Sequence, residues 1–263
     1  MASPTYIHGT APDEQERLTG LNTLTNAPFL DFLAVTPSST VLEVGSGLGI
    51  LAEEIARRVP NGEVWGIEFS AEQLARANHG VRNLKFIQGD AHQLPFEDHR
   101  FDVVYCRYLL EHVTDPLQVL REMYRVLKPG GEAFVQENNI LINTFDPDCP
   151  AFDFVWGRFA MLQSQLGGDA QIGKKLFSLF HRAGFDEIAL SVAPEIHHSG
   201  QPTFEAWIEN LIGNVRSGEV ALVAHGLCTH EEIRKAIAEL HTLLEREDAT
   251  ALFYWNRARG MKN

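Results

Sequence analysis

Cysteine is scarce in this chain of 263 residues, and long apolar runs are absent. The three cysteines, Cys106, Cys149 and Cys228, are far apart and form no CxxC pair, which argues against a disulfide framework or a zinc site. No apolar stretch reaches the roughly 18 residues that a membrane-spanning helix needs. The first residues are too polar for a secretory signal. We therefore expect a cytoplasmic protein with no membrane partner and no metal.

Basic side chains are also in short supply. There are 22 Lys and Arg residues against 35 Asp and Glu residues, which gives a formal net charge of −13. A nucleic-acid partner would need a basic surface, so we expect none, and the expected partner is a small-molecule acceptor. The length suits one well-buried domain with an insertion or a small cap. The sequence leaves the oligomeric state open.

What the sequence does contain is a regular alternation of strands and helices. We expect strands at residues 41–44, 63–68, 84–88, 101–106 and 132–136. Helical patterns separate them, at residues 50–59, 71–79 and 116–127. Such alternation predicts an α/β fold with a mainly parallel sheet. Further along the chain we expect helices at 171–183, 204–211 and 231–246 and strands at 188–192 and 251–257.

A glycine-rich turn follows the first expected strand. The segment VLEVGSGLG places Gly45, Gly47 and Gly49 directly before a helical pattern. Glycine lets the backbone pass close to a ligand and adopt left-handed angles. A strand, a glycine turn and a helix form the nucleotide site of open α/β sheets, at the carboxyl edge of the strands. Here the third glycine comes one residue earlier than in the dinucleotide fingerprint, and Ile50 replaces its last small residue.

Acidic residues near this turn indicate the charge of the ligand. Glu43 stands at its mouth, and Glu53 and Glu54 lie in the following helix, so a pyrophosphate would be repelled. A sulfonium and an ammonium group would be attracted. Glu68 ends the second strand, where an acid can bind both ribose hydroxyls, and Asp90 follows the third strand and could accept from an exocyclic amine. This order of groups predicts an adenosine pocket for S-adenosyl-L-methionine.

Five segments together resemble the class I S-adenosylmethionine-dependent methyltransferases. They are VLEVGSGLG, GIEFS, QGDAHQLPF, FDVVYCRYLLEHV and VLKPGGEAFVQE. The small-molecule branch (methyltransferase type 11), similar to the ubiquinone and menaquinone C-methyltransferases, matches best. The resemblance spans residues 6–137 and, less closely, 173–259.

The resemblance implies a Rossmann-like fold with helices on both faces of a seven-stranded, mainly parallel sheet. Its implied strand order is 3-2-1-4-5-7-6, with the seventh strand antiparallel. We expect N-terminal lid helices over residues 1–36 and a methyltransferase domain over residues 37–263. Cap insertions are expected near residues 138–168 and 199–248.

The resemblance also implies which residues contact the cofactor. They are Tyr6, Glu43, Gly45, Ser46, Gly47, Glu68, Phe69, Asp90, Ala91 and Arg107. Tyr6 belongs to the lid segment, and the glycine turn holds the methionine part. Glu68 resembles the ribose acid, and Phe69 would stack near the adenine. Asp90 and Ala91 resemble the adenine-amine contacts, and Arg107 lies at the methionine end.

Two histidines are candidate catalytic bases. Positioning can supply much of the acceleration of methyl transfer, so a base matters only for a phenol, an amine or an acidic carbon. His112 follows the fourth strand, and His8 lies in the lid segment. The alternatives are a histidine that only packs at a helix start and an exposed tail histidine. His197 and His198 have no metal-ligand spacing with nearby acids.

Aromatic residues of the expected cap are candidates for the acceptor site. They are Phe152, Phe154, Trp156, Phe159 and Trp207. They could line an apolar pocket for an aromatic or isoprenoid-like molecule, or they could only pack the cap against the sheet.

Three functions follow from these observations. The first is methyl transfer to O, N or C of a small, apolar or aromatic molecule. The second is a protein that binds the same cofactor without transferring its methyl group, as a rearrangement catalyst or a non-catalytic partner. The third, an NAD-dependent oxidoreductase, is disfavoured by Glu43 and Ile50.

Overall fold

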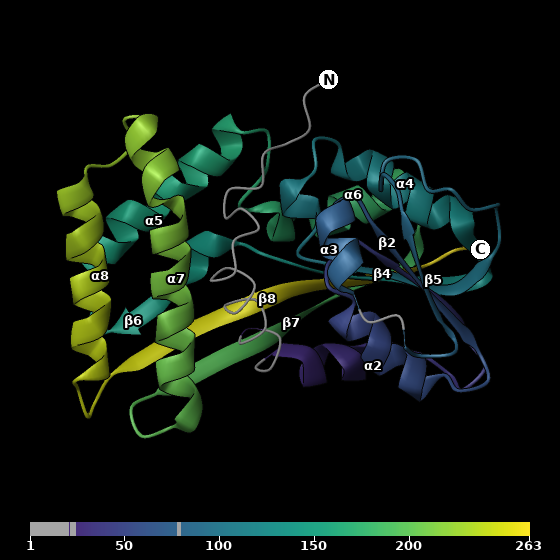
Figure 1. Ribbon diagram of the computed structural model, residues 1–263, viewed down its shortest axis with the longest axis horizontal. Helices are drawn as coiled ribbons and strands as arrows, with labels where there is room; N and C mark the ends of the chain where they lie inside the picture. The colour runs from purple at the N-terminus through teal and green to yellow at the C-terminus, as the bar shows by residue number, and fades with distance from the viewer. Residues whose placement is uncertain (1–20, 22–24, 78–79) are drawn as a thin grey trace. The chain divides into compact units, whose positions relative to one another are not determined.

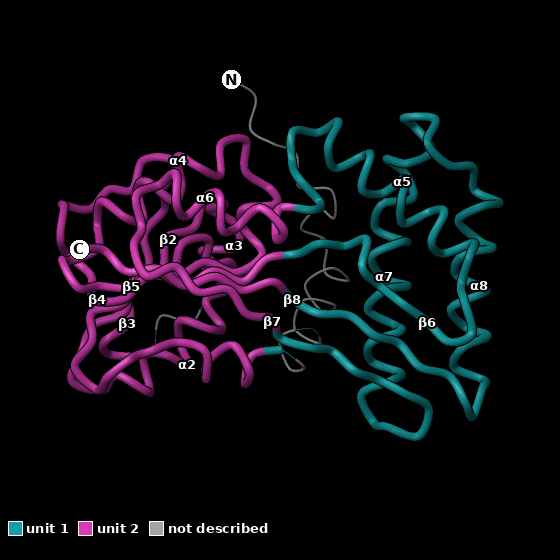
Figure 2. Tube along the Cα trace, turned by 180° about the vertical axis from the view of Figure 1, so that it is seen from behind, with its two compact units in different colours: residues 1–25, 138–171, 193–255 teal, residues 26–137, 172–192, 256–263 magenta. Residues whose placement is uncertain are grey.

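The computed structural model describes residue 21 and residues 25–77 and 80–263 (Figure 1). The predicted lid residues Tyr6 and His8 lie outside the described residues. The chain divides into two compact units, coloured separately in Figure 2. The described residues of unit 1 are Leu21, Thr25, Asn138–Gln171 and Ala193–Trp255. Unit 2 comprises Asn26–Glu137, Ile172–Val192 and Asn256–Asn263.

A parallel sheet forms the centre of unit 2. Its strands are β1 (Thr40–Val44), β2 (Glu63–Glu68), β3 (Leu84–Gln88), β4 (Phe101–Arg107) and β5 (Leu127–Glu137). They lie in the order β3-β2-β1-β4-β5, and all of these neighbours are parallel. The carboxyl ends of these strands therefore meet at one edge of the sheet.

Two long strands complete the sheet. Residues 256–261 of β8 (Thr250–Met261) pair antiparallel with β5, and β7 (Asp186–His198) pairs with β8. Because β7 and β8 are the sixth and seventh expected strands, the predicted order 3-2-1-4-5-7-6 is confirmed. One extra strand, β6 (Thr144–Asp146), pairs with residues 250–252 of β8 in unit 1.

Besides a helical stretch at residues 26–32, unit 2 contains four α-helices and two 3-10 helices among its described residues. They are α2 (Ile50–Arg58), α3 (Ala71–Arg76), η1 (Leu110–His112), α4 (Pro116–Val126), η3 (Ile172–Lys175) and α6 (Leu176–Ala183). Short polar residues start two of them: the side chain of Ser70 accepts from Gln73 N at 3.3 Å, and that of Asp115 accepts from Gln118 N at 3.0 Å. Gly184, with φ 97°, ends α6.

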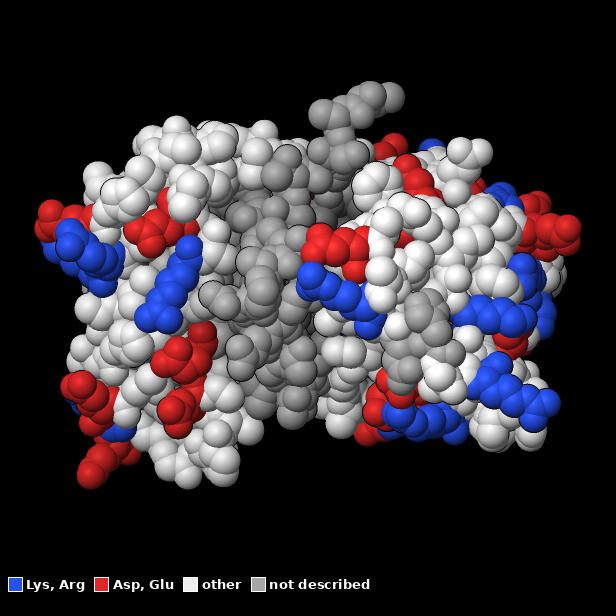
Figure 3. Space-filling view, in the orientation of Figure 1, with Lys and Arg blue, Asp and Glu red and all other residues white. Residues whose placement is uncertain are grey.

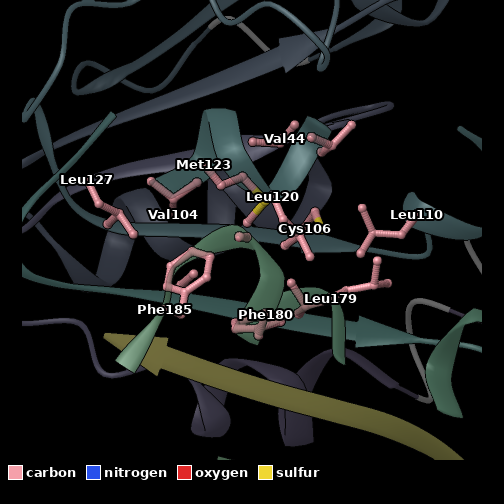
Figure 4. Packing of buried hydrophobic residues seen from close by; sticks show 14 of the residues in the cluster. Val44, Val104, Cys106, Leu110, Leu120, Met123, Leu127, Leu179, Phe180 and Phe185 are labelled. Atoms are coloured by element: carbon pink, nitrogen blue, oxygen red, sulfur yellow. The ribbon is translucent and has the colours of Figure 1, made fainter. Parts of the chain in front are cut away.

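The sheet of unit 2 is covered on both faces. Successive side chains of a strand point to opposite sides, so each central strand contributes to two cores. Val41 and Tyr105 belong to one buried cluster together with residues of α2. Val44, Val104 and Cys106 belong to the other cluster, which includes Leu120 and Met123 of α4 and Leu179 and Phe180 of α6 (Figure 4). Burial on both faces explains why the central strands are almost continuously apolar.

Unit 1 is mostly helical. Its described elements include η2 (Ile140–Ile142), α5 (Pro150–Gln165), α7 (Pro202–Ala224) and α8 (His230–Leu244). The three α-helices pack against one another. A Cβ on Gly218 of α7 would lie 2.5 Å from the Phe159 ring of α5, so glycine permits this close approach. Because α5 has large apolar residues on several sides, its sequence lacks a clear amphipathic period.

The described surface carries both signs of charge. Acidic and basic side chains are interspersed over the face shown in Figure 3. On the helices of unit 2, Arg57 pairs with Glu53 and Glu54, and Arg76 pairs with Glu72. Such exposed pairs add little stability. None of the helices in the described ranges is both long and apolar enough to cross a membrane.

Candidate functional site

The glycine turn lies between β1 and α2, and its shape requires glycine. Gly45, Gly47 and Gly49 have φ values of 75°, 52° and 74°, which lie in the left-handed region. A Cβ on Gly45 would lie 2.9 Å from the side chain of Leu109. A Cβ on Gly49 would lie 2.3 Å from the ring of Phe86. The turn is therefore constrained both by its backbone angles and by the side chains packed behind it.

Glu68, the predicted ribose acid, lies at this turn. Its Oε2 atom accepts from the backbone N–H of Gly47 at 2.9 Å, and its Oε1 accepts from Ser70 N at 2.8 Å. The backbone N–H groups of Gly45 and Ser46 donate to the Ile67 carbonyl, at 2.9 and 3.0 Å. The end of β2 thus holds the glycine turn in place, and the structure brings together two predicted parts of the site that are 21 residues apart.

Three buried polar atoms beside the turn have no hydrogen-bond partner in the described part of the chain. They are Oε2 of Glu43, Oγ of Ser46 and the hydroxyl of Tyr105. Glu43 is only 4% exposed, and it lies in register with Tyr105 on the neighbouring parallel strand. A buried polar atom without a partner is costly, and such atoms are rare in folded proteins. A ligand with hydrogen-bond donors would give these atoms partners.

Burial raises the pKa of Glu43 to about 8. The hydroxyl of Tyr105, the guanidinium of Arg107 and the N–H of Ala52 all lower this pKa, whereas the negative charge of Glu68 raises it. At neutral pH the Glu43 carboxyl is therefore mostly protonated. A positive group placed beside it would favour the ionised form, so the turn is suited to a cation.

Arg107 ends β4 on the same edge of the sheet. Its Nη2 atom donates to Oδ1 of Asn26 at 2.8 Å. Its guanidinium carbon lies 5.4 Å from the ring centre of Phe29 and 5.0 Å from that of Tyr108. These contacts hold the Arg107 side chain within unit 2, where its charge acts on Glu43.

The predicted adenine contacts lie on a more open part of the edge. Phe69 follows β2 and is 60% exposed. Asp90 follows β3, and its Oδ1 accepts from the backbone N–H of His92 at 2.8 Å and lies 2.7 Å from the imidazole Nδ1. Partial burial alone would raise the pKa of Asp90, but the contacts with His92 outweigh it and lower the pKa. Ala91 packs at the margin of the core.

His112, a candidate base, lies in the 3-10 helix η1 after β4. Its Nε2 atom is 3.7 Å from Oε1 of Glu111, and its side chain is 24% exposed. The helix is held by Glu137, whose Oε1 accepts from Leu109 N at 2.9 Å and from Leu110 N at 2.7 Å. Burial, together with the nearby Glu111 carboxyl, raises the pKa of Glu137 well above its usual range.

The sequence analysis did not single out Tyr105 or Glu137. Tyr105 lies within an otherwise apolar strand, and its link to Glu43 follows only from the register of β1 and β4. Glu137 is the last residue of β5 and is fully buried. An acid at the end of a buried strand is the signal that could have indicated it.

The aromatic residues of unit 1 mostly form its interior. Trp156 stacks on Phe152 and Phe159, with ring centres 5.1 and 5.3 Å apart. Its indole nitrogen donates to the Ile140 carbonyl at 2.6 Å. Phe154, in contrast, is 42% exposed. The packing interpretation therefore applies to the three stacked rings.

A second buried group in unit 1 involves His197. The His197 ring stacks on Trp207, and its Nδ1 lies 2.9 Å from the hydroxyl of Thr203. Its Nε2 is 3.3 Å from Oε2 of Glu195, and Oε1 of the same carboxylate accepts from the indole nitrogen of Trp255. Among the residues that the structure describes, no three His, Cys, Asp or Glu side chains gather closely enough to hold a metal ion.

Comparisons with known proteins agree with this geometry. A family model described as a methyltransferase domain matches residues 42–135. Demethylmenaquinone methyltransferase of Bacillus cytotoxicus is 34% identical over 172 residues, which are 59% of this chain and 73% of that protein. Relatives of the same name from Listeria are matched over only 55% of their length, so the chain spans about half the length of those relatives.

Two solved structures share the fold. A putative methyltransferase from Bacillus halodurans has a TM-score of 0.60 and 20% identity, over 91% of this chain and 100% of that one. The [4+2]-cyclase SpnF has a TM-score of 0.51 and 21% identity, over 99% of this chain and 86% of that one.

The sheet order and the glycine turn define a Rossmann-like methyltransferase fold. With the sequence relationship, they show that the chain belongs to the class I S-adenosylmethionine-dependent methyltransferases, in the small-molecule branch that includes the demethylmenaquinone enzymes.

Proposed function

We propose that the protein transfers a methyl group from S-adenosyl-L-methionine to O, N or C of a small, apolar or aromatic molecule. The observation that carries this proposal is the set of buried, unpartnered polar atoms of Glu43, Ser46 and Tyr105 at the glycine turn. An amino-acid ammonium group and ribose hydroxyls are donors of the kind that these atoms lack. The family membership supports the same ligand.

The residues at the edge of the sheet fit this cofactor. Glu43 and Ser46 would hold its methionine part, and the backbone of the glycine turn would pass beside it. Glu68 would bind the ribose, and the segment after β3 with Asp90 and Ala91 would hold the adenine beside Phe69. The cofactor supplies a methyl group on a positively charged sulfur. The proposed contribution of the chain is to bind this group next to the acceptor and to exclude water.

We propose that His112 is the base that takes up the proton that the acceptor loses when it is methylated. Its position after β4 is on the carboxyl side of the sheet, and its side chain is partly exposed. The neighbouring Glu111 carboxylate would stabilise the imidazolium form once the proton is taken. His8 and Tyr6 stay predictions for the lid.

The proposed kind of acceptor is based on the names of the similar proteins. The name of the Bacillus cytotoxicus relative points to a demethylated quinone, an aromatic molecule with an apolar tail. We propose an acceptor of that general kind, in a cytoplasmic protein without a nucleic-acid partner. The acidic net charge of −13 agrees with this choice of partner.

The test measures S-adenosylhomocysteine. The protein is mixed with S-adenosylmethionine and a panel of reduced quinones, phenols and amines, and the product is measured by mass spectrometry. We expect S-adenosylhomocysteine with at least one acceptor, and less of it from the Glu68→Ala variant when the cofactor is limiting. Binding of the cofactor by calorimetry without turnover on any acceptor would favour the cofactor-binding alternative. Binding of NAD in its place would overturn the proposal.

A further inference from the structure

Tyr105 is a buried tyrosine whose ring and hydroxyl have different surroundings. The ring packs in a core cluster and lies 5.7 Å from that of Phe29. The residue is fully buried, and its hydroxyl makes no hydrogen bond of good geometry in the described ranges, although the Glu43 carboxyl is near enough to act on it. Phenylalanine would pack in this core equally well and would avoid the cost of a buried hydroxyl. The hydroxyl therefore needs an explanation other than packing.

The parallel register supplies the neighbour of this hydroxyl. Glu43 on β1 and Tyr105 on β4 are direct partners, so their side chains extend from the same face of the sheet. The charged and polar groups that face Glu43 are Tyr105 and Arg107 from β4, Glu68 from β2 and the N–H of Ala52 from α2. Tyr105 is the neutral side-chain donor in this set.

This distinction matters for a cationic ligand. The guanidinium of Arg107 stabilises an ionised Glu43 but repels a second positive charge. A hydroxyl stabilises the same carboxylate without repelling the ligand. Burial and the negative charge of Glu43 raise the pKa of Tyr105 well above its ordinary value, so the hydroxyl stays protonated and able to donate.

We propose that Tyr105 is a positioning residue that holds the Glu43 carboxyl for the ammonium group of the cofactor, and so gives the site its preference for adenosyl ligands that carry an amino-acid end. This inference rests on the proposed function, because it assumes an adenosyl cofactor at the glycine turn.

The test is the Tyr105→Phe substitution, which removes one oxygen and keeps the ring. Two ligands are titrated by calorimetry: S-adenosylhomocysteine, which has the ammonium group, and 5′-methylthioadenosine, which lacks the amino-acid end. Since a hydrogen bond to a charged group contributes more than a neutral one, we expect about a tenfold loss of affinity for the first ligand. Affinity for the second ligand should change by less than about twofold.

Two further variants isolate the pair. Glu43→Gln should show the same selective loss for S-adenosylhomocysteine. Because the two side chains act together, adding Tyr105→Phe to Glu43→Gln should cause little further loss. Tyr124→Phe, on α4, is the matched control, and both affinities should stay unchanged in it.

The pH dependence gives a second measurement. In the native protein, affinity for S-adenosylhomocysteine should rise from pH 6 to pH 8 as Glu43 ionises. Loss of the hydroxyl raises the pKa of Glu43, so the midpoint should move to higher pH in Tyr105→Phe. A purely structural role would lower both affinities together and leave this midpoint in place.

The outcomes separate the two proposals. Failure of the native protein to bind either adenosyl ligand would contradict the proposed function itself. If the native protein binds both ligands, but Tyr105→Phe loses the same affinity for each of them or loses none, only the role of Tyr105 is overturned. Should the Tyr105→Phe variant fail to fold, a Glu43→Gln variant with an unchanged ratio of the two affinities would overturn it equally.

Discussion

The glycine turn of unit 2 and the aromatic stack of unit 1 use buried polar atoms in different ways. At the turn, Glu43, Ser46 and Tyr105 have buried oxygens without partners in the described residues. In the stack, the indole nitrogen of Trp156 donates to the Ile140 carbonyl. A buried polar atom with a partner is explained by packing, whereas one without a partner needs a further explanation, such as a ligand. Unit 1 also has such atoms, Nε1 of Trp207 and Nε2 of His197, so it is the gathering of three unpartnered oxygens beside the glycine turn that distinguishes the proposed site.

The largest expected effect tests the stack. Trp156→Ala removes a buried ring from between Phe152 and Phe159, and we expect a loss of about 3–5 kcal/mol in the free energy of unfolding. Phe154→Ala, on the exposed side of the same helix, should cost less than about 1 kcal/mol. Urea unfolding measures both. Similar small losses in the two variants would mean that the stack is not part of the core.

The next effect concerns the pH dependence of stability. The folded-state pKa of Glu43, about 8, lies above its ordinary value of 4.5. The folded chain therefore holds a proton that the unfolded chain has lost, and stability falls as the pH rises through this window. Between pH 5 and pH 8 the free energy of unfolding of the native protein should fall by about 3–4 kcal/mol more than that of the Glu43→Gln variant. Thermal unfolding at several pH values measures both proteins. The same pH dependence of stability in the native protein and in Glu43→Gln would contradict this account.

A third prediction tests the shape of the turn. Gly49 and Gly130 have similar φ values, 74° and 78°, but a Cβ meets Phe86 only at Gly49. Gly130→Ala should cost about 1 kcal/mol, for the left-handed backbone alone. Gly49→Ala should cost about 2–3 kcal/mol, because overpacking is added. Chemical denaturation of both variants checks the difference, and equal costs would show that Phe86 can move aside.

The smallest effect concerns the ligand at the turn. Glu68→Ala should weaken binding of S-adenosylhomocysteine by about 1–3 kcal/mol, because a charge-assisted hydrogen bond to the ribose is lost. Glu72→Ala, on the surface of α3, is the control and should leave the affinity unchanged. Calorimetric titration gives both values. An unchanged affinity in Glu68→Ala would remove this residue from the site.

Much of unit 2 could be predicted from local patterns. Alternating strands and helices predicted the parallel sheet, and the helices expected from residues 71 and 116 begin there, after the capping residues Ser70 and Asp115. The resemblance extended this to the position of β8 beside β5. Unit 1 was harder to predict, because α5 is apolar on several sides and α7 runs to Ala224, well beyond the predicted helix.

In the candidate site, too, some residues could be predicted from the sequence and others could not. Glu43, Glu68 and the glycines could be recognised because each lies at the end of a strand or in a turn of a known kind. Tyr105 could not be recognised, because its hydroxyl becomes relevant only when β1 and β4 pair in a particular register. Glu137 acquires its role in the same way, through the backbone of Leu109 and Leu110.

The sequence by itself determined the strand and helix pattern, the glycine turn and the acids at its edge, because these depend on local conformation and on the residues that follow each strand. The tertiary structure alone decided the protonation of Glu43 and the pairing of Glu68 with Gly47. It also decided which aromatic rings are buried. Burial and neighbouring charges set these properties, and both arise only when distant segments pack together.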